Sequence, residues 1–278
     1  MARIFDGKRF SEQIEKNILE SLGELGKPSL NLHTIFIGEN TGSEIYLRMK
    51  ERSLKRIGGT LTVHRFPETA NPDTVISEIE SLNNDPDTHG IMIELPLPGG
   101  WDVSAISSAI SPDKDVDVQN PLNIGRIVQG RALFVPPTPM AIMKVLDESG
   151  IELMGTEVCV VNHSVSIGRP VSLLLLQRNA TVHICHVFTK NLGKHSANAD
   201  ILIVAAGVPD LIRADMVKEG SVIIDVGMNR VNGKVTGDVD FDAVGEKAAF
   251  ITPVPGGIGP VTRYTLLSNL LKAYEMMR

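Results

Sequence analysis

The stretch EVCVVNHSVSIGRP, residues 157–170, contains the pattern that most directly indicates the fold. Its Val-rich start predicts a buried strand over Glu157–Val161. A polar turn follows, and Pro170 stands where the first turn of a helix is expected. A strand, a turn and a helix N-terminus in this order form the phosphate-binding unit of a Rossmann-type domain. The GxGxxG fingerprint is missing and only Gly168 remains of it, so the architecture supports this interpretation more than the glycines do.

The rest of the chain repeats the alternation of short apolar runs with longer amphipathic runs, which predicts βα units and mostly parallel strands. We expect strands at Leu32–Ile37, Thr60–Arg65, Gly90–Glu94, Glu157–Val161, Thr181–Cys185, Ile201–Ala205, Val222–Val226 and around Phe250. We expect helices at Ser43–Ile57, Pro72–Leu82, Val103–Ile110, Pro139–Ser149, Pro170–Arg178, Arg213–Val217 and Val261–Met277. The proline-rich stretch 111–139 predicts a connector or a cleft wall. The fold class expected is therefore α/β, with two α/β domains around a cleft, the second a Rossmann-like parallel sheet.

Composition excludes several classes of function. The chain has 278 residues and a formal charge of −6, and only 4% of its residues are aromatic, which argues against nucleic-acid partners. No apolar stretch reaches the ~20 residues of a membrane span, and the charged N-terminus does not resemble a signal peptide. Cys159 and Cys185 are too few for a disulfide scaffold. We expect a soluble, reduced, cytoplasmic protein without membrane partners.

The expected helix Ser43–Ile57 carries a charged residue in its apolar stripe. Tyr46, Lys50, Leu54 and Ile57 recur at helical spacing on one face, so Lys50 stands where an apolar residue is usual. Its side chain either extends along the helix to solvent or points into a cleft beside Tyr46 as an acid/base or an anchor for a carbonyl.

Two acidic residues, Glu94 and Asp117, can each be either a solvated surface residue or part of a site. Glu94 ends an expected buried strand, where active sites of parallel sheets collect, so it either pairs with Lys50 or begins a solvated loop. Asp117 ends the run Asp113–Asp117, which is either a solvated face or part of a site.

The end of the second strand of the expected Rossmann domain favours NADP over NAD. An Asp or Glu that binds ribose hydroxyls is absent there, and His163, His186 and Lys190 stand nearby instead. His183 and Cys185 share one face of the strand while His186 points to the other, so we expect packing and no metal site.

The stretch TPVPGGIGPVT, residues 252–262, predicts a rigid loop before the last helix. Its glycines allow the backbone to approach a ligand closely, and a turn with a purely structural role would not need so many.

Together these motifs resemble the bifunctional methylenetetrahydrofolate dehydrogenase/cyclohydrolase (FolD-type) family along essentially the whole chain. The motifs that carry the resemblance occur in the family's order: Tyr46-x-x-x-Lys50, Leu95–Pro98, Lys114–Asp117, Ser164-x-x-Ile167-Gly168-x-Pro170, Asp225–Asn229, Gly237–Val239 and Thr252–Thr262.

The resemblance implies NADP as cofactor, tetrahydrofolate one-carbon derivatives as substrates, and a homodimer. It implies oxidation of 5,10-methylenetetrahydrofolate to the methenyl cation and hydrolysis of that cation to 10-formyltetrahydrofolate. It also implies a folate-binding catalytic domain over residues 1–118, joined by the last helix 261–278, and an NADP-binding domain over residues 119–260.

The resemblance also implies the site residues. The catalytic residues expected are Lys50, Tyr46, Glu94 and Asp117. The cofactor-binding residues expected are Asn162, His163, Ser164, Ile167, Gly168, His186, Val187, Gly207, Met228 and Thr262. The substrate-binding residues expected are Tyr46, Lys50, Asp117, Pro255, Gly256 and Gly257.

Several positions depart from the family's usual residues. Glu94 replaces a Gln and would keep Lys50 protonated, so we hypothesise that hydrolysis is weak or that Glu94 shares the proton transfer. With Asn162-His163 and Val187, fewer of the family's usual contacts to the 2′-phosphate of NADP remain, so binding of that phosphate depends on nearby histidines. This predicts a preference for NADP that weakens as pH rises through the range where histidines titrate. Val118, Pro137 and Arg263-Tyr264 are further departures in the folate pocket.

Three alternatives remain at this point. A monofunctional dehydrogenase is the nearest of them, and Glu94 motivates it. A two-domain amino-acid or shikimate-type dehydrogenase would leave Tyr46, Lys50 and the loop 252–262 unexplained. A non-catalytic dinucleotide-sensing module would need neither an inward Lys50 nor Asp117.

Overall fold

The chain folds into two compact α/β units. The computed structural model describes residues 1–278, the side chain of Thr41 excepted. The large-sheet unit comprises Met1–Glu12 and Thr138–Thr262, and the small-sheet unit comprises Gln13–Pro137 and Arg263–Arg278.

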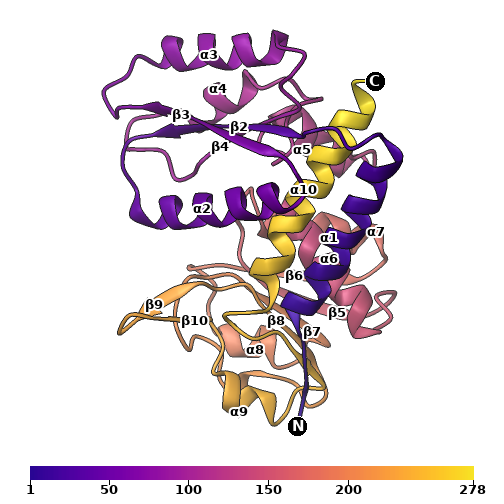
Figure 1. The fold of residues 1–278 in the computed structure, drawn as a ribbon. Coiled ribbons are helices and arrows are strands. Elements are labelled where there is room, and N and C mark those ends of the chain that lie inside the picture. The colour runs from indigo at the N-terminus through magenta and orange to yellow at the C-terminus, as the bar shows by residue number, and fades with distance from the viewer. The chain divides into compact units, whose positions relative to one another are not determined.

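The small-sheet unit is built on parallel strands in the order β3-β2-β4, with bounds Thr60–Phe66, Asn31–Ile37 and Gly90–Ile93. Helices α3 (Pro72–Asn84) and α4 (Val103–Ser108) cover one face, and α2 (Thr41–Arg56) covers the other (Figure 1). The face toward α3 buries an apolar cluster that includes Ile35, Ile79 and Ile91. Ile91 and Ile93 of β4 thus face α3, and Met92 and Glu94 point to the α2 side because side chains alternate along a strand.

Asparagine side chains set where helices of this unit begin. The Asn40 side chain accepts a hydrogen bond from the backbone N–H of Ser43, and that of Asn71 from Asp73 N–H, so each satisfies a donor that a helix start leaves unpaired. These caps fix α2 and α3 at the edge where the parallel strands end.

The large-sheet unit contains a parallel sheet in the strand order β1-β11-β8-β7-β5-β6. The strand bounds are Arg3–Ile4, Phe250–Ile251, Val222–Asp225, Ile201–Val204, Glu157–Val161 and Thr181–Cys185. All residues of β7 and β8 are buried, as expected for a sheet covered on both faces. The other elements of this unit are α7 (Gly168–Gln177), α8 (Leu192–Ser196), α9 (Phe241–Gly245), a 3₁₀ turn at Ala214–Met216, and a hairpin of β9 (Asn229–Val231) and β10 (Lys234–Thr236).

Three helices contribute residues to both units: α1 (Gly7–Glu24), α6 (Pro137–Ser149) and α10 (Ile258–Met276). Within the small-sheet unit, α10 is held by Asn269, whose amide nitrogen donates to Val116 O and Val135 O, both at 2.8 Å. The part of α10 from Arg263 onward is therefore anchored in the small-sheet unit.

The predicted α/β class is confirmed, and the expected strands lie within a residue or so of their predicted bounds. The expectation of a bare connector over 111–139 is wrong in part, because α5 (Pro121–Val128) forms there. Its start is capped by the Asn120 side chain, which accepts from Leu122 N–H, with Pro121 in the first turn. The expected helix at Arg213–Val217 is only a 3₁₀ turn, and α10 begins before Val261.

The unit boundaries also differ from those expected. Residues 1–12 belong to the large-sheet unit because β1 pairs with β11. Residues 119–137 belong to the small-sheet unit, where Gln119 and Asn123 bond to Ile93 and Asp115. Which ligand each unit binds stays a prediction.

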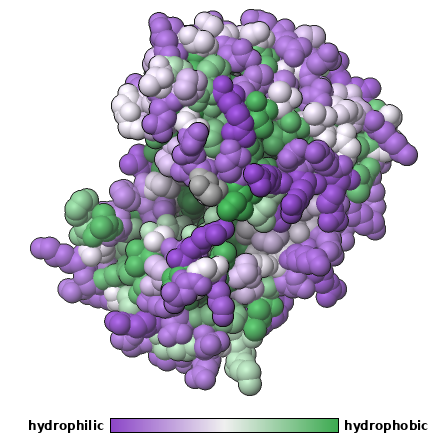
Figure 2. Space-filling model, turned by 60° about the vertical axis from the view of Figure 1, so that its left-hand side comes forward, coloured by the Kyte–Doolittle hydropathy of each residue, from purple (hydrophilic) through white to green (hydrophobic). Residues whose placement is uncertain are grey.

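Apolar residues reach the surface in separate groups on the face drawn in Figure 2, between polar ones. Among the described residues, no helix has the length and apolar character needed to cross a membrane.

Candidate active site

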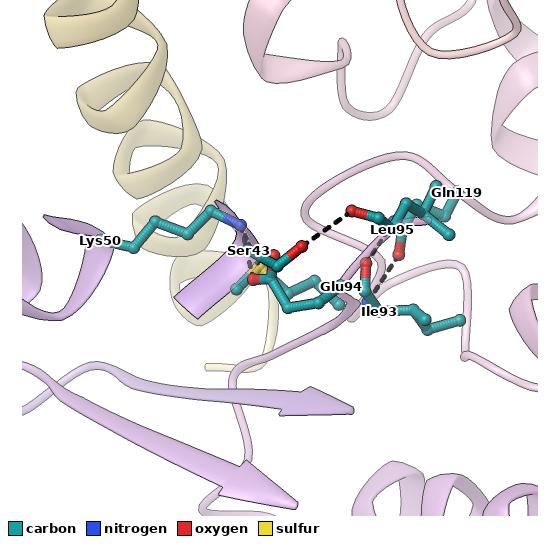
Figure 3. Close-up of polar contacts among 7 residues, drawn as sticks. Ser43, Lys50, Ile93, Glu94, Leu95 and Gln119 are labelled. Carbon is teal, nitrogen blue, oxygen red and sulfur yellow. Dashed lines mark hydrogen bonds and ion pairs between the residues drawn. The ribbon is translucent and has the colours of Figure 1, made fainter. Parts of the chain in front are cut away.

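Lys50 lies on the inner face of α2 and makes a buried ion pair. Its Nζ is 2.7 Å from Oε1 of Glu94, and the side chains of Lys50 and Glu94 are only 11% and 7% exposed (Figure 3). The same Nζ lies 3.8 Å from Sδ of Met92 and 5.2 Å from the ring centre of Tyr46. The Lys50 side chain therefore points inward beside Tyr46, and Glu94 is its partner rather than the first residue of a solvated loop. The catalytic role expected for Lys50 stays a prediction.

The end of β4, from which Glu94 projects, is fixed by a side chain that the sequence did not single out. Gln119 accepts from the N–H of Ile93 at 2.7 Å and donates to its carbonyl at 2.8 Å, as a neighbouring strand would (Figure 3). Ser43 Oγ donates to Leu95 O at 3.3 Å, so the start of α2 is bonded to the residue that follows Glu94. Glu94 is thus held between two anchored neighbours.

The motif Lys114–Asp117 places its charged residues in different roles. Buried Asp115 accepts from the N–H groups of Gln119 and Asn120 at 2.8 and 3.0 Å and so orders the segment that carries Gln119. Lys114 donates to Leu82 O and Asp85 O, where α3 ends. Asp117 remains half-buried and close enough to Lys50 for their charges to interact. The run is therefore structural at Lys114 and Asp115, which leaves Asp117 as the site candidate.

Burial and charge together set the protonation of this site. Burial alone would lower the pKa of Lys50, but the charges of Glu94 and Asp117 and the hydrogen bond to Glu94 outweigh it and raise that pKa. Burial raises the pKa of Asp117 to about 7, with Lys50 opposing and Glu94 adding to the shift. Burial also raises the pKa of Tyr46. The site therefore holds a charged ammonium next to a carboxyl group that can change protonation near neutral pH.

In the large-sheet unit, Asn162 builds the turn after β5. Its Oδ1 accepts from Ser164 N–H at 2.8 Å, Ser164 Oγ at 2.7 Å and Gly168 N–H at 2.9 Å, while its Nδ2 donates to Ala205 O at 2.6 Å. A Cβ on Gly168 would lie 2.1 Å from the carbonyl oxygen of Asn162, so glycine is required there. Asn162 thus positions the turn at the start of α7, next to Ile167 and Gly168.

The end of β6 presents histidines and apolar residues rather than a carboxylate. The rings of His163 and His186 lie with centroids 4.9 Å apart, and Val187 is 82% exposed. His186 Nδ1 accepts from Phe188 N–H at 3.2 Å, which leaves Nε2 as its outward donor. Among the described residues, no group of three His, Cys, Asp or Glu side chains is arranged to hold a metal ion.

Two buried carboxylates organise the remaining loops of this unit. Asp238 accepts from the N–H groups of Ala206, Gly207 and Val208 and from Asn229 Nδ2. Asp225 accepts from the N–H groups of Gly227, Asp238 and Val239 at 2.9–3.1 Å, and burial raises its pKa to about 6. The expected cofactor residues Gly207 and Met228 lie on the loops held in this way. The sequence motifs contained both carboxylates, but no role was predicted for them.

The loop 252–257 is packed tightly within the large-sheet unit. Thr252 Oγ1 accepts from Asp225 N–H at 2.8 Å, and Gly7 N–H donates to Gly256 O at 2.9 Å. A Cβ on Gly257 would lie 2.5 Å from Pro253 O, so the loop depends on its glycines. Pro255, Gly256, Gly257 and Thr262 thus lie on a rigid segment, and their ligand contacts stay predictions.

Comparisons with known proteins agree along the whole chain. Two family models match: the tetrahydrofolate dehydrogenase/cyclohydrolase catalytic domain over residues 5–117, and the NAD(P)-binding domain of the same enzymes over residues 136–278. A bifunctional protein FolD of Nitratiruptor sp. is 44% identical over 279 aligned residues, which cover 99% of each chain.

Solved structures give the same result. The bifunctional FolD enzyme of Campylobacter jejuni is 37% identical and has a TM-score of 0.95 over 99% of both chains. The FolD enzyme of Trypanosoma brucei, solved with NADP and an inhibitor, is 33% identical with a TM-score of 0.94 over 99% of this chain and 98% of that one. The chain belongs to the tetrahydrofolate dehydrogenase/cyclohydrolase family.

Proposed function

We propose that this chain catalyses both reactions of its family. It oxidises 5,10-methylenetetrahydrofolate to 5,10-methenyltetrahydrofolate with NADP and hydrolyses that product to 10-formyltetrahydrofolate. The observation that carries the proposal is the buried pair of Lys50 and Glu94 beside Tyr46 and Asp117, because a binding module has no need for a buried ammonium in a stripe of apolar residues. The bifunctional relatives do not favour a monofunctional or a non-catalytic protein.

Lys50 and Glu94 handle the proton transfers of hydrolysis in this proposal. The oxygen of a water molecule bonds to the methenyl carbon and passes one proton to Glu94. The bond from that carbon to one ring nitrogen then breaks as Lys50 protonates the nitrogen, and Lys50 regains the second proton of the water as the formyl C=O forms. Lys50 carries the proton that the nitrogen needs, and Glu94 lies 2.7 Å from Lys50 as a proton acceptor. Glu94 therefore shares the proton transfer instead of only weakening the lysine as a base.

Tyr46 and Asp117 orient the substrate. The Tyr46 ring offers an apolar face for an aromatic part of folate, and the carboxyl of Asp117 accepts hydrogen bonds from the amino groups of the pterin edge. Hydride transfer needs the donor carbon held face to face with its acceptor, so this positioning supplies most of the acceleration of the first reaction.

The large-sheet unit holds NADP in this proposal, and its residues fit that group. The turn that Asn162 builds carries Ser164, Ile167 and Gly168 at the start of α7, where backbone N–H groups suit a phosphate. His163 and His186 stand where an NAD enzyme has a carboxylate, and their N–H donors suit a 2′-phosphate. Gly207, Met228, Val187 and Thr262 complete the proposed set. When bound, NADP accepts the hydride from the one-carbon unit of the substrate.

We propose a homodimer in the cytoplasm, with no nucleic-acid or membrane partner. The family resemblance motivates the dimer. Strand β6 supports it, because it ends the sheet and leaves Thr181, His183 and Ile184 exposed. Light scattering on the purified protein measures the oligomeric state, and a monomer at micromolar concentration would contradict the dimer.

A spectrophotometric assay with 5,10-methylenetetrahydrofolate and either NADP or NAD tests the function. The formation and the decay of the methenyl product are followed separately. We expect NADP-dependent formation and enzyme-dependent decay. Formation without decay would indicate a monofunctional dehydrogenase, and no turnover with either cofactor would indicate a sensing module.

A further inference from the structure

We infer that Arg263 forms a carboxylate-binding subsite for the glutamate tail of the substrate. Arg263 is the first residue of α10 that belongs to the small-sheet unit. The inference rests on the proposed function, because it identifies a part of the substrate that the same site recognises.

The position of Arg263 is defined by α2. Its Nε donates to Oγ of Ser53 at 3.3 Å, and Ser53 is buried. Tyr46, Lys50 and Ser53 follow one another at four- and three-residue spacing and share one face of α2. The charge of Arg263 also acts on the Tyr46 hydroxyl, in the same sense as that of Lys50. Arg263 therefore lies beside the stripe that carries the candidate active site.

The guanidinium of Arg263 has donors left for a ligand. Nε is the nitrogen with a partner, and within the part of the chain that the structure describes neither Nη1 nor Nη2 has a hydrogen bond or a carboxylate within ion-pair distance. The carboxylate of Glu94 is paired with Lys50, and that of Glu15 with Arg56. A half-buried guanidinium with its outer nitrogens unused is suited to a planar anion that binds through two oxygens.

The chemistry of the substrate supplies that anion. Tetrahydrofolate carries an aminobenzoyl ring that ends in glutamate, so an aromatic face and a carboxylate follow each other along the molecule. Tyr46 offers a ring and Arg263 a fork of donors, and the two lie close enough for the charge of Arg263 to act on the Tyr46 hydroxyl. The ring packs on Tyr46, and a glutamate carboxylate accepts from Nη1 and Nη2 of Arg263.

The test compares two substrates in steady-state kinetics of the dehydrogenase reaction. One is 5,10-methylenetetrahydrofolate, and the other is its diamide, in which both glutamate carboxylates are carboxamides. For the unchanged enzyme we expect the KM of the diamide to be about tenfold higher, as for the loss of one charge-assisted bidentate contact, with kcat little changed. For Arg263→Met we expect the same high KM for both substrates, and for Arg263→Lys an intermediate contrast, because Lys keeps the charge and loses the fork.

Arg48→Met is the matched control. Arg48 is an exposed arginine of α2 that lies two residues from both Tyr46 and Lys50, hence on the opposite face, and its loss should leave the contrast between the substrates intact. Equal KM values for the two substrates in the unchanged enzyme would overturn the inference while leaving the proposed function in place, and so would an undiminished contrast in Arg263→Met. If Arg263→Met does not fold, the unchanged enzyme and Arg263→Lys still decide between these outcomes. No turnover of either substrate by the unchanged enzyme would overturn the proposed function itself.

Discussion

The ammonium of Lys50 and the carboxylate of Glu94 lie 2.7 Å apart, although 44 residues separate them in the sequence. Burial lowers the pKa of Lys50, and the charge of Glu94 is the main influence that raises it. A variant without that charge loses this influence. In Glu94→Gln the pKa of Lys50 therefore falls, and a neutral amine forms at lower pH. We expect the pH profile of methenyl hydrolysis to move to lower pH by about one unit or more.

The measurement is the hydrolysis rate between pH 6 and 9, with the dehydrogenase rate as a reference. Glu44→Gln is the matched control, because it removes the carboxylate of another pair that α2 makes, with Arg65 at 2.6 Å. A profile and a rate that do not change in Glu94→Gln would contradict the proposed sharing of the proton.

Lys50 should matter more for hydrolysis than for hydride transfer. Lys50→Met keeps the length of the side chain and removes the proton carrier, so we expect hydrolysis to fall about 100-fold or more. The dehydrogenase reaction depends on positioning and should lose less. Both rates are measured on one preparation, with Lys55→Met as the control, since Lys55 pairs with Glu51 on the exposed side of the same helix. Equal losses in the two reactions would argue against this division of roles.

Asp117 predicts a pH dependence of substrate binding. Its pKa is raised to about 7, so the carboxyl group is protonated below neutral pH and ionised above it. An ionised carboxylate accepts hydrogen bonds with both oxygens and a protonated one does not, so the KM for methylenetetrahydrofolate should rise as pH falls through about 7. In Asp117→Asn this inflection should disappear, whereas Asp113→Asn, at an exposed position of the same run, should keep it. An inflection that persists in Asp117→Asn would assign it to another group.

The strands were predictable because their residues are apolar and β-branched and because turn residues bound them. Strands β5 and β6 have the predicted bounds, since each is a short run of mostly β-branched or apolar residues. The two-residue strand β1 carries no period, and its place is set by pairing with β11, almost 250 residues away. Because of that pairing the N-terminal residues belong to the large-sheet unit, and no local sequence pattern indicates such a long-range contact.

The same distinction holds for the candidate site. Lys50 was found because a cation interrupts an apolar stripe of regular spacing, which is a local signal. Gln119 was missed because its amide serves the backbone of Ile93, 26 residues away, and a polar residue after an acidic run looks like part of a solvated loop. The contact between Arg263 and Ser53 has no local signal in the sequence, because it depends on how α10 packs on α2.

Tyr264 should contribute to stability through its hydroxyl. Its Oη donates to Oε2 of Glu15 at 2.5 Å, and Arg56 holds the other oxygen of Glu15 at 2.8 Å, which ties α10 and α2 to α1. Tyr264→Phe leaves the buried carboxylate without this donor, so we expect the free energy of unfolding to fall by about 1.5–3 kcal/mol in urea titrations. Tyr274→Phe, whose ring packs edge-on against His89, serves as the control and should change little.

The same contact sets a pH window. Burial and Glu15 raise the pKa of Tyr264 to about 12 from an ordinary value of 10. A raised pKa means that the stabilisation is complete below about pH 10 and is lost as pH rises through 12. The difference in unfolding free energy between the unchanged protein and Tyr264→Phe should therefore be constant from pH 7 to 9 and shrink above 10. A difference that is already absent at pH 8 would contradict this account.

Asp238 should affect the binding of NADP and not the binding of the folate substrate. Its carboxylate accepts from three consecutive N–H groups, those of Ala206, Gly207 and Val208, and from Asn229, so it fixes two loops of the large-sheet unit at once. In Asp238→Asn one oxygen becomes an NH₂ group that faces N–H donors, and two of these bonds are lost. We expect the KM for NADP to rise about tenfold, since each unsatisfied buried donor costs about 1–3 kcal/mol and the loops relax to recover part of that cost. The KM for methylenetetrahydrofolate should stay within about twofold.

The split between the two KM values separates this role from general destabilisation. Asp240→Asn is the control, because Asp240 caps α9 by accepting from Ala243 N–H, a task that Asn performs equally well. Both variants are assayed well below their melting temperatures, so that a loss of folded enzyme lowers kcat for both substrates without changing either KM. If Asp238→Asn instead raises the KM for folate as much as that for NADP, the prediction is contradicted. The loops that carry Gly207 and Met228 would then not serve the binding of NADP alone.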